Sequence, residues 1–192
     1  MQAGTLKVTG KADADALLNS DPLALLLGML LDQQVPMEWA FASPHTLLRR
    51  LGTLDVTSIV ATGPEALEAA FCEKPALHRF PSSMGKRAYA MCEFLLENYP
   101  AGPMDLWREV GDGEELFKRI RALPGFGDEK AKIFLALLAK RFGIRPDNWE
   151  QYAGAFADEM PRSVADIDGP ESLARVRAWK KQQKAQGKSK QD

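Results

Sequence analysis

Cysteine and histidine are scarce in this chain of 192 residues, which has two of each. Cys72 and Cys92 lack the paired spacing of a metal site, and an iron–sulfur cluster would need four cysteine ligands. His45 and His78 lie far apart, with no neighbouring carboxylate or thiolate pattern. We therefore expect no metal site and no iron–sulfur cluster, and we predict two reduced core thiols of a cytoplasmic protein.

A strong charge of one sign and a long apolar run are also missing. The 25 Lys and Arg residues against 26 Asp and Glu give a net charge of −1, so contact with nucleic acid has to come from local patches. The longest apolar run, residues 23–31, is too short to span a bilayer. No basic stretch followed by an apolar one opens the sequence, so we see no signal peptide. We expect a soluble protein without membrane contact.

Strand alternation bounded by turn dipeptides is absent as well, whereas helix starts are frequent. Asp21-Pro22, Ser43-Pro44, Gly63-Pro64 and Gly169-Pro170 each place proline at a first helical position. They predict helices to about residues 34, 51, 73 and 183, with another short helix after Pro36. Ser83 is a candidate cap for a helix that ends before residue 100. The sequence predicts an all-α fold.

The segment Leu-Pro-Gly-Phe-Gly, residues 123–127, interrupts two helical patterns. Proline cannot donate a backbone hydrogen bond, and two nearby glycines allow positive φ and a close backbone approach. With Asp128 as N-cap, the segment predicts two helices joined by a tight hairpin. The amides of such a hairpin form an anion site at a helix N-terminus. An ordinary corner between helices is the alternative interpretation.

Three segments together carry a family resemblance. The hairpin, followed by a long helix, resembles that of the helix-hairpin-helix–GPD superfamily of DNA glycosylases. Leu-Leu-Asp-Gln-Gln-Val, residues 30–35, is similar to the paired-glutamine segment of its alkylated-base (3-methyladenine) branch. Met-Gly-Lys-Arg-Ala-Tyr, residues 84–89, is similar to the basic helix start that precedes the hairpin there. Order and spacing fit, so the resemblance covers roughly residues 20–150.

The resemblance implies two helical lobes with a substrate cleft between them. Residues 20–146 would form the helix-hairpin-helix lobe, residues 1–19 and 147–184 a smaller second lobe, and residues 185–192 a basic flexible tail. It also implies a monomer on double-stranded DNA, associated with the nucleoid, with a monovalent cation as an option at the hairpin. The implied DNA-contacting residues are Gln33, Gln34, Leu123, Pro124, Gly125, Phe126, Gly127 and Lys130.

In this family the target base is flipped into the cleft, and a carboxylate stabilises the cationic sugar as the base leaves. The resemblance places this carboxylate at Asp147, although Asp147 also fits a turn or cap. Asp166 and Asp168 compete with it and have the same capping alternative, and Glu129 is a further candidate for the functional carboxylate. Bifunctional members carry a lysine where this chain has Glu129. We therefore expect a monofunctional DNA glycosylase without lyase activity.

Two alternatives remain open at the level of sequence. The chain could be a non-catalytic relative that recognises damaged or distorted duplex, or a helical protein-interaction module that uses the hairpin only as a corner. Trp39, Phe80 and Trp149 are each candidates to line a flipped-base pocket, and the sequence does not choose among them. The Lys-rich tail fits a solvated helix end or added phosphate affinity.

Overall fold

The computed structural model describes residues 4–191. Within that range the chain forms ten α-helices and three short 3-10 helices and no β-strand, which confirms the all-α fold class. Residues 1–3 and 192, the outer ends of the predicted second lobe and of the predicted tail, lie outside the described residues. The α-helices are α1 (Ala12–Ser20), α2 (Pro22–Leu31), α3 (Met37–Leu51), α4 (Val56–Thr62), α5 (Pro64–Cys72), α6 (Pro81–Asn98), α7 (Gly113–Arg121), α8 (Asp128–Phe142), α9 (Trp149–Ala153) and α10 (Pro170–Ala185).

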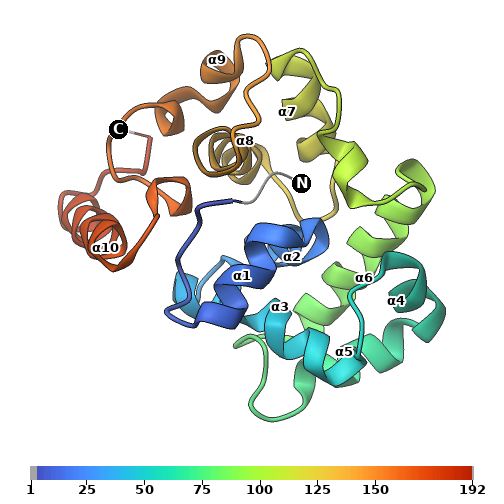
Figure 1. The fold of residues 1–192 in the computed structure, drawn as a ribbon. Helices are drawn as coiled ribbons and strands as arrows, with labels where there is room; N and C mark the ends of the chain where they lie inside the picture. Colours follow the sequence, from blue (N-terminus) through green and yellow to red (C-terminus); the bar gives the residue numbers. More distant parts are fainter. Residues whose placement is uncertain (1–3, 192) are drawn as a thin grey trace.

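Helix α2 lies at the centre of the molecule (Figure 1). Its sequence PLALLLGMLL is apolar all round, and every residue after Pro22 is buried, as expected of a helix surrounded by other elements. The Asp21 carboxylate accepts a hydrogen bond from the Ala24 amide at 2.9 Å and caps its start. Gly28 lets α3 approach closely, because a Cβ there would lie 2.6 Å from Cδ1 of Phe41.

The other helices surround α2 and α8. Helices α3 to α6 lie together on one side, α7 and α9 lie next to α8, and α10 lies on the opposite side of the molecule from α4 (Figure 1). One cluster of buried hydrophobic side chains includes Leu26 and Leu135 from the centre and Leu6, Phe156 and Val176 from the predicted second lobe. The division into two lobes stays a prediction, since this core runs through both.

Two predicted helices in the α3 region were wrong. Instead of a short helix after Pro36 and a second one opening at Pro44, α3 is continuous and holds Pro44 inside. Proline leaves one carbonyl of the helix without its donor, which is a local cost. Burial of Phe41 and Leu47 on either side of Pro44 offsets that cost.

Three predicted boundaries also differ. Helix α2 ends at Leu31 and leaves both glutamines outside it, because Asp32 departs from helical geometry (φ −72°, ψ 72°). Helix α6 begins at Pro81, so Ser83 lies within its first turn and is not its cap. The N-cap of α8 is Gly127, one residue before Asp128. Pro81 at the first helical position sets the start of α6, and the extended backbone of Gly127 sets the start of α8.

Among residues 4–191, no single helix is long and apolar enough to cross a membrane. Helices α1 and α2 pass the test of length and composition only as a pair, and they are bent by 112° where they meet.

Candidate nucleic-acid interface

The two glutamines form a tight turn directly after α2. The Gln33 amide donates to the Leu31 carbonyl at 2.7 Å, and Gln34 adopts a left-handed backbone conformation with φ 56°. A non-glycine residue in this region costs about 1–2 kcal/mol, so its neighbours have to hold it there. The turn therefore presents Gln34, whose side chain is exposed, in a fixed position.

The side chain of Gln33 is fully engaged with the protein. Its Nε2 donates to the Leu30 carbonyl at 3.0 Å and lies 3.2 Å from Sδ of Met84. Its Oε1 accepts a hydrogen bond from Nη1 of Arg87 at 3.3 Å. These contacts join the glutamine turn to the first turns of α6. Gln33 therefore supports the turn, whereas the side-chain amide of Gln34 makes no hydrogen bond within residues 4–191.

His78 fastens the same turn from the other side. Its Nδ1 accepts a hydrogen bond from the Phe80 amide at 3.1 Å, so in the neutral ring the proton lies on Nε2. That Nε2 donates to the Gln33 carbonyl at 3.0 Å. The ring is 1% exposed, and its burial lowers the pKa of His78 below its ordinary value. The neutral imidazole thus links the glutamine turn to the start of α6.

This lowered pKa predicts a loss of stability in acid. Between the folded and the unfolded pKa the unfolded chain binds more protons, so the contribution of His78 is present above about pH 6.5 and is lost as the pH falls below it. Chemical denaturation between pH 7.5 and 5 should show this decline in the free energy of unfolding. His78→Gln should be less stable at pH 7.5 and should flatten the profile over that range. His45→Gln is the matched control, and an unchanged profile in His78→Gln would contradict the assignment.

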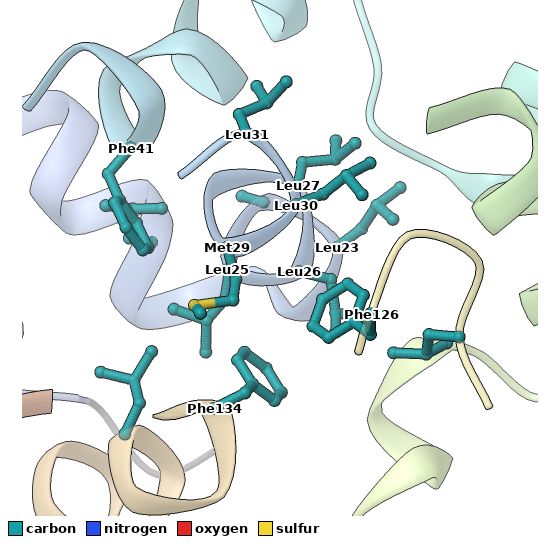
Figure 2. Packing of buried hydrophobic residues seen from close by; sticks show 14 of the residues in the cluster. Leu23, Leu25, Leu26, Leu27, Met29, Leu30, Leu31, Phe41, Phe126 and Phe134 are labelled. Carbon is teal, nitrogen blue, oxygen red and sulfur yellow. The ribbon is translucent and has the colours of Figure 1, made fainter. Parts of the chain in front are cut away.

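The hairpin docks against α2 beside the glutamine turn. Leu123 and Phe126 are buried, and the Phe126 ring meets Phe134 of α8 edge to face at 6.0 Å. Figure 2 shows Phe126 next to Leu26 of α2. Gly125 has φ 87°, and a Cβ on it would lie 2.5 Å from Cδ1 of Leu30. Glycine is therefore required at residue 125 both for the backbone conformation and for the close approach to α2.

The backbone amides at the outer edge of the hairpin have no hydrogen-bond acceptor among the residues that the structure describes. Within residues 4–191, the amides of Gly127, Asp128 and Glu129 donate no hydrogen bond, and no side chain caps α8. Gly127 is exposed and has extended backbone (φ −98°, ψ −178°) with no atom within 4 Å of a Cβ placed on it. These amides at a helix N-terminus can accept an anion. The carbonyls of Gly125 and Phe126 also lack a donor in this range and are the oxygen type that an alkali cation takes.

Lys130 joins the hairpin to the end of α2. Its Nζ donates to the carbonyls of Met29 at 2.8 Å and Leu30 at 2.7 Å and lies 5.7 Å from the centre of the Phe126 ring. Burial lowers the pKa of Lys130 to about 8. Two of its three donors thus serve the C-terminal carbonyls of α2, where a cation is favoured.

A surface pocket of about 310 Å³ lies between the glutamine turn and α10. Asp32 and both glutamines line one side, and Lys180 and Lys190 line the other. Nζ of Lys180 approaches Sδ of Met37 at 3.1 Å, and burial lowers the pKa of this lysine. Asp32 accepts no side-chain hydrogen bond within residues 4–191 and acts electrostatically on both Lys130 and Lys180. The pocket therefore combines a free carboxylate with an ammonium group.

The carboxylates suggested by the sequence lie elsewhere. Asp147 is exposed near the start of α7, where its amide donates to the Gly111 carbonyl at 2.8 Å. The hairpin is at the other end of α7 and α8, and the 15 residues of α8 span about 22 Å. Asp166 accepts from Lys140 at 2.7 Å and caps a 3-10 turn, and Asp168 pairs with Arg141 at 3.2 Å. The structure does not bring these three aspartates to the glutamine turn.

Glu129 lies in the first turn of α8 and pairs with Lys190 at 2.9 Å. The end of the chain therefore passes close to the hairpin. The Lys190 backbone carbonyl accepts a hydrogen bond from Nη1 of Arg162 at 3.1 Å. The predicted tail thus contributes a cation to the edge of the pocket.

Sequence reasoning named the two glutamines and the hairpin but missed three residues of this site: Asp32, His78 and Lys180. Asp32 directly precedes the glutamines, and this adjacency was the one local signal. His78 and Lys180 reach the turn through contacts across 45 residues or more, which no spacing rule encodes.

Comparison of the chain with protein-family models, with curated proteins and with solved structures finds no match. The case for a function depends on the geometry of these residues.

Proposed function

We propose that this chain is a monomeric, duplex-DNA-binding protein of base excision repair, a DNA N-glycosylase without lyase activity. One observation carries the proposal, namely that three segments far apart in sequence meet at one surface. Arg87 of α6 bonds to Gln33, and Lys130 of α8 bonds to the last carbonyls of α2. These are the three segments that carry the resemblance to helix-hairpin-helix glycosylases.

The hairpin would hold a phosphate of the DNA backbone. Free amides at Gly127, Asp128 and Glu129 support this role, because amides at a helix N-terminus favour an anion. A monovalent cation, where bound, would be held by the Gly125 and Phe126 carbonyls and would add positive charge facing the phosphate. Such contacts fix the position of the protein on DNA without reading its sequence.

Gln34 would enter the space left by an extrahelical nucleotide, and its free amide can replace lost pairing hydrogen bonds. Gln34→Ala should weaken the preference for a lesion or mismatch over intact duplex by about tenfold and leave the melting temperature nearly unchanged. Gln33→Ala is the matched structural variant and should lower stability by about 1 kcal/mol, since it removes two part-buried contacts and the hydrogen bond from Arg87. Anisotropy titrations and thermal melts distinguish the two. If Gln34→Ala kept the same preference for the lesion duplex over intact duplex as the parent, this role would be contradicted.

The chemical step needs a carboxylate near the sugar of the flipped nucleotide, where positive charge grows as the base leaves. Asp32 meets this requirement best, because it lines the pocket next to Gln33 and Gln34 and its carboxylate accepts no hydrogen bond from residues 4–191. Its place at the C-terminal end of α2 adds the negative end of the helix dipole.

The test is incubation with duplexes that each hold one lesion, scoring released base and alkali-labile sites. The proposal expects release of base from at least one alkylated duplex, with strand breaks only after alkali. No release from any lesion, by protein that binds the duplexes, would leave the second candidate.

That second candidate is a non-catalytic protein that recognises damaged or distorted duplex. The position of Asp147 favours it, since the carboxylate implied by the family lies at the far end of α8 from the hairpin.

A further inference from the structure

Two large aromatic side chains are exposed beside the glutamine turn. Trp39, in the first turn of α3, is 39% exposed, and Phe80, directly before α6, is 44% exposed. Within residues 4–191 the one other large hydrophobic side chain exposed to this degree is Met160, which lies between α9 and α10. Single exposed hydrophobic residues are normal on a protein surface, but two aromatic rings next to one buried histidine form a small shared apolar surface beside the candidate nucleic-acid site.

Both rings lie near the ring of His78. The centre of its ring lies 6.3 Å from that of Trp39 and 6.0 Å from that of Phe80. The same histidine donates to the Gln33 carbonyl and accepts from the Phe80 amide. A single buried side chain therefore ties the backbone of Phe80 to the turn that presents Gln34 and also lies next to the ring of Trp39.

The surroundings of the rings are cationic. The guanidinium carbon of Arg79 lies 4.8 Å from the centre of the Phe80 ring, and the exposed Arg87 reaches the same turn through Gln33. Arginine next to exposed aromatic rings suits a polyanion that also carries flat apolar groups. Nucleic acid with unstacked bases has both properties.

We infer that Trp39 and Phe80 form a stacking surface for an unpaired nucleobase. This inference rests on the proposed function and assigns the part of the DNA that the surface receives. Every base has a π face, so stacking tolerates any base and suits a protein that meets many flanking sequences. Among the three aromatic candidates from the sequence, the structure favours Trp39 and Phe80, since Trp149 is 8% exposed and packs at the start of α7.

Tryptophan fluorescence tests the surface directly. Trp107, Trp149 and Trp179 are buried, so quenching on addition of DNA reports on Trp39. Duplex with one unpaired thymine, and an oligothymidine strand, should quench the emission, and intact duplex should quench it much less. Trp39→Phe should bind these DNAs as the parent does but lose the signal.

Affinity measurements complete the test. Trp39→Ala and Phe80→Ala should each weaken binding to the duplex with an unpaired base by about tenfold and leave intact duplex unaffected, as expected for one lost stacking contact. Met160→Ala is the matched control and should change neither affinity. If the protein binds intact duplex but the duplex with an unpaired thymine does not quench the Trp39 emission, the stacking surface is overturned and the proposed function still stands. Failure to bind any DNA would overturn both, and a protein partner would then be the occupant of this surface.

Discussion

Gly127→Val should weaken binding to duplex DNA of any sequence by at least about tenfold, while the protein stays folded. The variant places two methyl groups where the backbone would approach a phosphate, and each hydrogen bond to a charged group contributes about 1.5–3 kcal/mol. The structure itself has room for the side chain, because no atom lies within 4 Å of a Cβ at this residue and its backbone is extended. Anisotropy titration with labelled duplex measures the loss.

The chain offers a close control in Gly169, which is also an N-cap glycine with extended backbone and open space around a Cβ. Gly169→Val should bind DNA as the parent does. Gly125→Ala is the contrasting variant: it should unfold more easily, by about 1–2 kcal/mol or more, because φ is positive and Leu30 is too close. Unchanged DNA binding by Gly127→Val would remove the hairpin from the interface.

The second large effect concerns the chemical step. Asp32→Asn should lower the rate of base release by about 10²–10³-fold and leave binding to the same lesion intact, because it deletes a charge with little change of shape. Single-turnover release of the base measures this rate. Loss of binding together with release would show that Asp32 holds the turn and does not act on the sugar.

Asp147→Asn is the paired variant, and its result decides between the carboxylate that the family resemblance implies and the one that the pocket favours. Full activity in Asp147→Asn together with loss of activity in Asp32→Asn would assign the chemical step to Asp32. The reverse result would assign it to Asp147. Borohydride should trap no protein–DNA adduct, since Glu129 cannot form a Schiff base. An adduct that disappears in Lys180→Gln would overturn the absence of lyase activity and name the pocket amine as nucleophile.

The fold class and most helix starts were predictable because they depend on local chemistry. Asp21-Pro22, Gly63-Pro64 and Gly169-Pro170 all stand where the structure begins a helix. Helix α3 was not predictable in the same way, since tertiary burial of Phe41 and Leu47 overrides the local preference of Pro44. Helices α1 and α4 were missed because they are short, with 9 and 7 residues, and give a periodic pattern little length in which to repeat.

The site was predictable only in part. Glycine spacing indicated the hairpin, and the resemblance of residues 30–35 to a family segment indicated the glutamines; both signals are contiguous in sequence. The division of roles between Gln33 and Gln34 depends on Arg87 and Met84, more than fifty residues away. Lys130 was expected at the DNA, and the structure uses its ammonium on the end of α2. The distance of Asp147 from the hairpin follows from the direction of α8, which spacing alone does not give.

The measurement that tests the central claim most directly is equilibrium binding of the wild-type protein to duplex DNA with and without one abasic nucleotide, over a range of salt concentrations. The account predicts tighter binding to the abasic duplex, and a logarithm of the binding constant that falls linearly with the logarithm of salt concentration, with a slope of about 0.9 for each phosphate contacted. Absence of duplex binding at low salt, by protein that is folded, would contradict the account.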